Sequence, residues 1–140
     1  ENQARRKLNT QYISYSFKGQ VSNSVLQKNI SENSYDLIIN SSESEGIPVS
    51  LMEAMSKYVV PIAPNIGGIK HLVDRKNGYL ISSAAKVEEI SDAVLDYIYK
   101  QSDEQQIQKI SAYHKVKESY NSQINYTNLI KIVERVLGVK

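Results

Sequence analysis

The chain of 140 residues contains no cysteine, and this absence removes whole classes of protein from consideration. Without thiols, a disulfide framework and a thiolate metal site are both excluded. A cysteine-free composition fits a reducing compartment, so we expect a cytoplasmic protein. The sequence also lacks any apolar run that approaches the ~20 residues of a membrane span, and it shows no signal peptide at its start.

A strong net charge is missing as well. Seventeen Lys and Arg residues against fifteen Asp and Glu residues leave a charge of +2, which is too small to indicate a nucleic-acid partner. The hydrophobic content of 41% and the charged content of 23% are ordinary for a soluble globular domain. An initiator methionine is absent from the start, Glu1-Asn-Gln-Ala, so we expect one N-terminally truncated domain of a longer protein.

Three consecutive basic residues, Arg5, Arg6 and Lys7, lie in a segment from Ala4 to Leu8 that is predicted to end a polar helix. Most such clusters form a solvated helix face. The alternative is contact with phosphate or with an anionic lipid surface, which would place the protein at the inner face of a membrane. Both interpretations remain open at this point.

Alternating apolar runs and helical periods predict an α/β fold. The expected sheet is Rossmann-like and parallel, with about four strands and with helices on both faces. The expected strands are Tyr12–Phe17, Asp36–Asn40, Val59–Ala63 and Tyr79–Ile81. The expected helices are Val25–Ile30, Pro48–Lys57, His71–Val73, Val87–Tyr99, Asp103–Tyr120 and Tyr126–Leu137. Apolar stripes predict that Leu51, Met55 and Tyr58 pack in the core, as do Leu129, Ile130, Val133 and Leu137.

The most informative stretch runs from Ser41 to Met55 and predicts a loop between a buried strand and a helix. Pro48 suits the first position of that helix because its φ is fixed. Loops at the carboxyl ends of parallel strands carry the ligand sites of α/β sheets. The first N–H groups of the helix, near Val49, Ser50 and Leu51, would face such a site and favour phosphate.

Two carboxylates flank the start of this helix. Glu45 lies in the loop, and Glu53 follows within the helix, where its side chain would lean back toward the N-terminus. A carboxylate in that place can accept hydrogen bonds from a diol beside a bound phosphate. The simpler interpretation is that Glu45 favours the helix dipole and that Glu53 pairs with Lys57. From spacing alone, the simpler interpretation is preferred.

A longer pattern changes that preference. Its elements are Ser42, Glu45-Gly46-Ile47-Pro48, Leu51, Glu53-Ala54-Met55 and Asn65-Ile66-Gly67-Gly68. The pattern resembles the donor-site signature of the retaining GT-B glycosyltransferases, family 4 (group 1 glycosyltransferases) in particular. It extends over most of the chain and is dense between Asp36 and Ile81. The resemblance implies the C-terminal donor-binding domain of a GT-B fold, without its first βαβ part.

The resemblance also implies roles for individual residues. Glu45 would contact the donor sugar as the catalytic carboxylate, and Glu53 would bind the ribose hydroxyls. The remaining donor-binding positions would be Ser42, Gly46, Ile47, Val49, Ser50 and Leu51. The base or neighbouring loops would be contacted by Gln20, Val21, Gly67 and Gly68. No metal and no cofactor are expected, because the substrate is a nucleotide-diphosphate sugar such as a UDP- or GDP-sugar and the sequence has no Asp-x-Asp motif.

The sequence departs from the family at several points. Tyr58 stands where a glycine is usual, and His71 stands where a glutamate is common, so no role is assigned to His71. The glycine loop whose Arg and Lys neutralise the diphosphate is missing, as is the domain that binds the acceptor. A glycan or lipid-linked acceptor would therefore be bound elsewhere, and this fragment alone is predicted to be inactive.

Two other classes of function remain open. A GT-B epimerase that acts on nucleotide sugars, or a phosphorylase, shares the architecture, because a fold does not fix a reaction. A non-catalytic, flavodoxin-like binding or receiver module would require a phosphorylatable Asp at the end of a strand, but Asp36 begins its strand. Uracil, guanine and adenine bases are all compatible with the sequence, and the sugar, linkage and acceptor are equally open.

Overall fold

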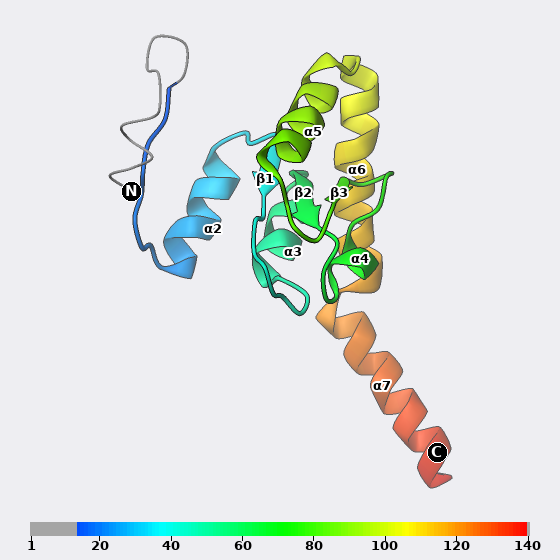
Figure 1. Ribbon diagram of the computed structural model, residues 1–140. Coiled ribbons are helices and arrows are strands. Elements are labelled where there is room, and N and C mark those ends of the chain that lie inside the picture. The colour runs from blue at the N-terminus through cyan, green and yellow to red at the C-terminus, as the bar shows by residue number, and fades with distance from the viewer. Residues whose placement is uncertain (1–13, 140) are drawn as a thin grey trace.

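A parallel sheet forms the centre of the computed structural model, which describes residues 14–139. Its strands are ordered β1-β2-β3, and the register places Ile62 of β2 opposite Tyr79 of β3. Parallel neighbours require crossover connections, and these are supplied by α3 and α4 (Figure 1). The strands are β1 (Leu37–Ile39), β2 (Val60–Pro64) and β3 (Tyr79–Ile81). The predicted α/β fold with a parallel sheet is confirmed, with three strands in the described part of the chain.

The helices follow the predicted order, with shifted ends. They are α2 (Asn23–Glu32), α3 (Val49–Met55), α4 (Ile69–Leu72), α5 (Val87–Tyr99), α6 (Ser102–Ser119) and α7 (Ser122–Leu137). The bounds of α5 are those predicted. Helix α4 was predicted to begin at His71, but it begins two residues earlier, at Ile69, directly after its N-cap Gly68.

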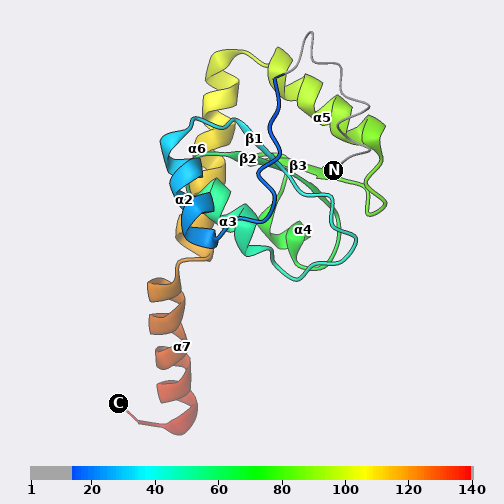
Figure 2. The same cartoon turned by 90° about the vertical axis from the view of Figure 1, so that its left-hand side faces the viewer.

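Helices cover both faces of the sheet, as predicted. Figure 2 shows α5 on one side and α3 and α4 on the other. On the first face, buried Ile62 and Ile81 pack with Ala93 of α5. On the second face, α3, α4 and α6 enclose the larger cluster: Leu51, Met55, Ala63, Ile69, Leu72, Val73 and Ala112. Neighbouring residues of β2 thus point to opposite faces, as pleating requires.

Polar contacts hold the junction of β3, α5 and α6. The Tyr79 hydroxyl donates to Asp96 Oδ2 (2.7 Å), and Lys100 Nζ donates to the same carboxylate (2.7 Å). The hydrogen bond from Lys100 lowers the pKa of Asp96, while burial raises the pKa of the Tyr79 hydroxyl. Buried Gln108 of α6 accepts from Lys100 Nζ (3.4 Å) and donates to the Gly78 carbonyl (3.4 Å). The end of α5 is thereby fixed to the sheet and to α6.

Pro61 occupies the central strand although it has no N–H for the ladder. Strand β3 begins opposite Ile62, so the residue beside the proline is Gly78. A Cβ atom on Gly78 would lie 2.5 Å from the Pro61 carbonyl oxygen and 2.7 Å from its Cγ. Only a glycine allows the chain to pass this close, and Pro61 is tolerated because β3 starts just beyond it.

Tyr58 lies just after α3 and does not pack in the core, so the predicted stripe of Leu51, Met55 and Tyr58 is wrong at its last member. Leu51 and Met55 are fully buried, but Tyr58 is 43% exposed. Its φ is +63°, which turns its side chain out of the helical stripe. The Tyr58 N–H donates to the Met55 carbonyl, and the Val59 N–H donates to the Ala54 carbonyl. These two bonds form the Schellman motif that ends many helices.

The predicted strand Tyr12–Phe17 is not found among its described residues. Residues 14–17 are not in a strand, and residues 12 and 13 lie outside the described part. Tyr15 and Phe17 contact each other edge to face, with ring centroids 5.6 Å apart, and both remain exposed. A strand needs a neighbour for its ladder bonds, and β1 pairs within the described residues with β2 alone.

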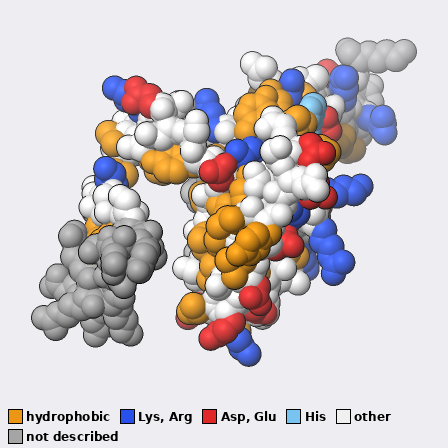
Figure 3. All heavy atoms as spheres, turned by 90° about the horizontal axis from the view of Figure 1, so that it is seen from above, with side chains coloured by type: hydrophobic (Ala, Val, Ile, Leu, Met, Phe, Trp, Pro, Cys, Tyr) orange, Lys and Arg blue, Asp and Glu red, His pale blue; other side chains and the backbone are white. Residues whose placement is uncertain are grey.

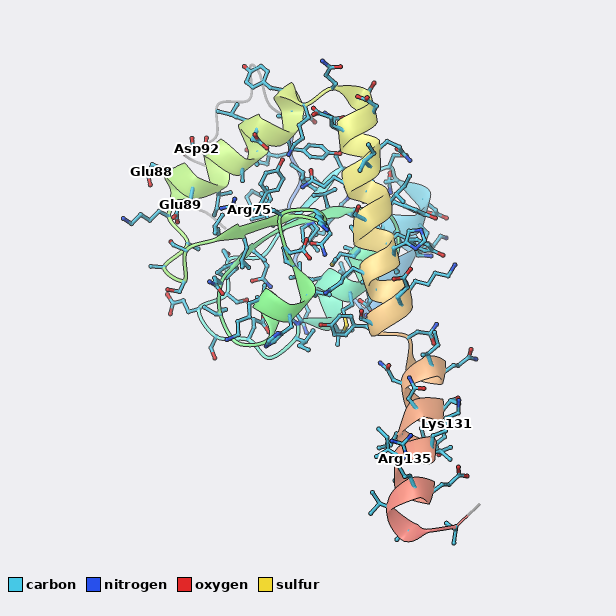
Figure 4. All side chains as sticks on the ribbon, turned by 90° about the vertical axis from the view of Figure 1, so that its right-hand side faces the viewer. Arg75, Glu88, Glu89, Asp92, Lys131 and Arg135 are labelled. Carbon is cyan, nitrogen blue, oxygen red and sulfur yellow. The ribbon has the colours of Figure 1, made fainter. Side chains whose placement is uncertain are left out.

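The predicted packing of α7 is also wrong, although the helix is present and ends at Gly138 with a φ of +67°. Figures 1 and 2 show α7 projecting from the body. Leu129, Ile130, Val133 and Leu137 are 42–67% exposed. Basic Lys131 and Arg135 also project from α7 (Figure 4). The apolar stripe predicted the helix correctly, but the other described residues do not cover these side chains.

Two sequence predictions concern the part of the chain before residue 14. The basic cluster of Arg5, Arg6 and Lys7 lies outside the described residues, as does the helix end predicted around it. Among residues 14–139, no helix combines the length and the apolar character that a membrane span requires.

Candidate functional site

The loop after β1 is ordered by its own side chains. Asn40 Oδ1 accepts a hydrogen bond from the Ser42 N–H (2.9 Å), which is the local turn that asparagine favours. The Ser42 hydroxyl then donates to Glu45 Oε1 (2.8 Å). Both Ser42 and Glu45 are partly buried. The carboxylate of Glu45 is therefore held in one direction at the carboxyl end of the sheet.

The loop after β2 is locked against the loop after β1. The Gly68 N–H donates to the Gly46 carbonyl (2.9 Å). Gly67 has a φ of +47°, and a Cβ atom there would lie 1.8 Å from the Glu45 carbonyl oxygen. A Cβ atom on Gly68 would lie 2.4 Å from Ile47 Cγ1. Both glycines are thus required for contact between the two loops, and the structure brings together five of the predicted positions.

Helix α3 begins directly after this contact. Pro48 is its N-cap, one position earlier than a first helical residue, and it is buried. The first backbone hydrogen bond of the helix runs from the Met52 N–H to the Pro48 carbonyl (3.3 Å). The N–H groups of Val49, Ser50 and Leu51 precede that bond, as predicted for a helix start. The Leu51 side chain is in the core, whereas Val49 and Ser50 are exposed.

Glu53 does not form the ion pair with Lys57 that the simpler interpretation predicted; no such pair is present in residues 14–139. Instead, Asn23 Nδ2 donates to both carboxylate oxygens of Glu53, at 3.2 and 3.3 Å. Asn23 is the first residue of α2, so this contact ties the start of α2 to α3. The exposed residues Gln20 and Val21 directly precede α2.

A hollow of about 400 Å³ lies beside the loop after β1. It is lined by Ser41, Ser42 and Glu43 from that loop and by residues 83–85 after β3. Both segments follow the carboxyl ends of their strands, where α/β sheets bind ligands. The hollow therefore adds space next to Ser42, which itself holds Glu45.

Two residues of this region were not singled out from the sequence. Asn40 follows the strand directly and precedes two serines, which is a recognisable turn signal. Asn23 gives no such signal, because its bond to Glu53 joins residues thirty positions apart. Predicted turn chemistry could have identified Asn40, whereas Asn23 required the fold.

The described residues contain no group of three His, Cys, Asp or Glu side chains that could hold a metal ion. His71 is exposed on α4, and its backbone N–H donates to the Gly68 carbonyl (3.0 Å). The polar groups placed at the carboxyl end of the sheet are the Glu45 carboxylate, the Ser42 hydroxyl and the backbone N–H groups at the start of α3.

Residues 7–115 match the family model described as "Glycosyl transferases group 1". A similar solved structure is the 1.35 Å crystal structure of the C-terminal domain of a glycosyl transferase group 1 family protein (LpcC) from Francisella tularensis. The two chains are 28% identical with a TM-score of 0.50, and the match covers 62% of this chain and 44% of that one. No match is found among curated proteins. The family model covers well over half of the sequence, and the chain belongs to the group 1 glycosyl transferases.

Proposed function

We propose that this chain is the donor-binding part of a glycosyltransferase that moves a sugar from a nucleotide-diphosphate sugar to an acceptor, with retention of configuration. The observation that carries the proposal is the locked pair of loops. Glu45 is oriented by Ser42, and its loop is held by Gly67 and Gly68 at the start of α3. Family membership supports sugar transfer, and the place of these loops supports the donor as their ligand.

In this proposal each group has a separate task. Glu45 binds hydroxyl groups of the donor sugar, and Glu53 binds the ribose hydroxyls. The N–H groups of Val49, Ser50 and Leu51 receive the diphosphate, which is also the leaving group. Hydrogen bonds that strengthen as the leaving group gains charge lower the barrier to reaction. No metal is required in this scheme.

The rest of the enzyme is proposed to supply what this chain lacks. Another domain would bind the acceptor, which would be a glycan or a lipid-linked sugar used in polysaccharide synthesis. The reaction would take place in the cytoplasm or at the inner face of a membrane. Closure of the two domains would complete the site. We therefore expect the isolated fragment to bind donor weakly and to transfer no sugar.

Calorimetric titration of the full-length enzyme with UDP, GDP and their sugars tests the roles of the two carboxylates. Glu53→Ala should weaken even the sugar-free nucleotide, by about 1–3 kcal/mol for a lost charged hydrogen bond. Asn23→Ala should act in the same direction because Asn23 orients Glu53. Glu45→Ala should chiefly reduce turnover and sugar selection.

The matched control is Glu88→Ala, because Glu88 lies on the first turn of α5 (Figure 4) and not on these loops. It should leave nucleotide affinity and turnover unchanged. Equal nucleotide affinity of the wild type and Glu53→Ala would remove the ribose role. Conversion of the donor to an isomer without transfer to any added acceptor would exclude the transferase itself.

A further inference from the structure

A second pocket, of about 540 Å³, lies between α2, α3 and α6. Two of its lining residues, Tyr35 and Tyr58, come just before β1 and β2 in the chain. The pocket therefore sits at the amino ends of the strands, whereas the loops with Glu45 and Gly67 follow the carboxyl ends. Figure 2 shows the three helices that border it, and Figure 3 shows α2 as a lobe beside the body. This pocket is distinct from the proposed donor site.

Two stacked tyrosines form one wall of this pocket. The rings of Tyr58 and Tyr113 are nearly parallel, at 15°, with centroids 4.5 Å apart. Tyr58 keeps 43% of its surface exposed. Lys117 Nζ lies 5.3 Å from the centroid of the Tyr113 ring, within the range of a cation–π contact. The wall is thus a rigid aromatic surface with a cation beside it.

The backbone at Tyr58 indicates that its ring has a role. Tyr58 adopts a φ of +63°, a region in which a bulky side chain is an outlier. The same position of a Schellman motif usually carries glycine, which ends a helix there without strain. Strained residues of this kind concentrate at ligand-binding sites. A tyrosine retained in this conformation therefore points to a use for its exposed aromatic surface.

The polar lining defines the ligand. Two lysines, Lys57 and Lys109, line the pocket together with the Gln106 amide and the hydroxyl groups of Ser31 and Ser34. Other polar groups of the lining are hydrogen-bonded within the protein: the Asn33 amide and the Tyr35 hydroxyl donate to Asn29, and the Ser56 hydroxyl donates to the Glu53 carbonyl. No Asp or Glu is among the lining residues. Lys109 is paired with Asp36 (2.7 Å), but Lys57 has no ion pair with any residue in 14–139. The pocket therefore offers one uncompensated cation, an amide and serine hydroxyl groups to a ligand.

We propose that this pocket binds an acidic saccharide, with a sugar ring packed on Tyr58 and its anionic group facing Lys57. Sugar rings carry aliphatic C–H faces that pack on aromatic rings, and their hydroxyl groups suit amides and serines. A lipid chain would need an apolar lining, but Ile30 is the one aliphatic side chain there. The proposal does not depend on donor binding at the opposite end of the sheet.

The test is a titration of the ¹⁵N-labelled 140-residue chain with tetragalacturonic acid, followed by NMR. Amide shifts are expected around Tyr58, Lys57 and Tyr113. Tyr58→Asn keeps the backbone conformation, because asparagine tolerates positive φ, and should weaken binding roughly tenfold, or about 1.4 kcal/mol. Lys57→Met keeps the apolar stem and should weaken binding about threefold, the range of an exposed charge contact.

Matched controls on α7 are Tyr126→Asn and Lys131→Met, which remove the same groups at exposed positions away from the pocket. These variants should bind as the wild type does. The proposal is overturned if millimolar tetragalacturonic acid shifts no pocket resonance, or if its uncharged galactose counterpart binds equally well. It is also overturned if UDP shifts the same resonances more strongly, or if Tyr58→Asn, folded by circular dichroism, binds undiminished.

Discussion

The contact between the two loops can be tested by placing one methyl group at two nearby glycines. In Gly67→Ala the new Cβ would lie 1.8 Å from the Glu45 carbonyl oxygen and 2.9 Å from its carbonyl carbon. In Gly46→Ala the new Cβ would meet nothing within 4 Å. The two variants make the same chemical change on facing loops, and they differ in the contact and in the positive φ of Gly67.

The expected cost of Gly67→Ala has two parts. An L-residue at a φ of +47° is disfavoured by about 1–2 kcal/mol. Displacing one backbone segment from another adds about 1–3 kcal/mol, as overpacking does elsewhere. The sum of about 2–5 kcal/mol is large against a typical domain stability of about 5–15 kcal/mol. Gly46→Ala should cost nothing, because the substitution also restricts the unfolded chain.

Urea unfolding followed by circular dichroism measures these free energies, and hydrogen exchange at the Gly68 N–H reports on the loop contact itself. Gly67→Ala should lower the unfolding free energy and accelerate that exchange. Gly68→Ala should lie between the other two variants: its Cβ would meet Ile47 Cγ1 at 2.4 Å and the Gly46 carbonyl oxygen at 2.9 Å, but its φ of −87° adds no strain. Equal unfolding free energies and equal Gly68 exchange in Gly67→Ala and Gly46→Ala would refute the locked-loop interpretation.

Three further predictions concern stability. The hydrogen bond from Lys100 lowers the pKa of Asp96 in the folded state. The ionised Asp96 therefore stabilises the fold above its unfolded pKa of about 3.9, and this stabilisation is lost as the pH falls below that value. In urea titrations, the difference in unfolding free energy between the wild type and Asp96→Asn should shrink below about pH 4. Tyr58→Gly relieves about 1–2 kcal/mol of backbone strain and loses about 0.5–1.5 kcal/mol of ring stacking. Its melting temperature should therefore stay near that of the wild type. Tyr113→Ala loses the same stacking but relieves no strain, so it should melt at a clearly lower temperature. Asn77 is buried; its amide donates to the Leu72 carbonyl, and its Oδ1 accepts from the Asp74 N–H. Asn77→Ala should therefore lower the unfolding free energy by about 1–3 kcal/mol. A urea midpoint equal to that of the wild type would contradict this role.

Local patterns in the sequence were enough to predict most of the elements. Helix α5 has the predicted bounds because its apolar period and its flanking lysines are close in sequence. Strand β3 is preceded by an Asn-Gly pair that signals a turn, and its bounds are also as predicted. Signals of this kind need no knowledge of distant residues, which is why they identify elements well.

Burial could not be predicted in the same way. The apolar stripe of α7 predicts a helix that favours a partner, but it does not say which surface lies opposite. Residues 14–17 alternate as a strand does, but they belong to no strand of the described sheet. For α7 the pattern predicted the local conformation but not the packing, and for residues 14–17 it predicted neither.

In the candidate site, too, the sequence predicted the positions of the loops but not the contact between them. The pattern from Ser42 to Gly68 predicted where the loops lie, and the two glycines were expected to contact the base or a neighbouring loop. The structure gives them a second reason to be glycine, because the Glu45 carbonyl occupies the space beside Gly67. The sequence from Ser42 to Gly68 does not indicate which backbone atom will lie against a glycine, so this contact could be found only in the structure.

The locked loops explain why the parts of the pattern occur together. The position of Glu45 depends on its backbone carbonyl, which lies against Gly67, and on Ser42, which fixes its carboxylate. The hydrogen bond from the Gly68 N–H to the Gly46 carbonyl fixes the turn into α3. A change in either loop would therefore move the carboxylate and the helix start together. For this reason Ser42, Glu45 and the glycine pair form one structural unit, and a match to all of them is more specific than a match to any one.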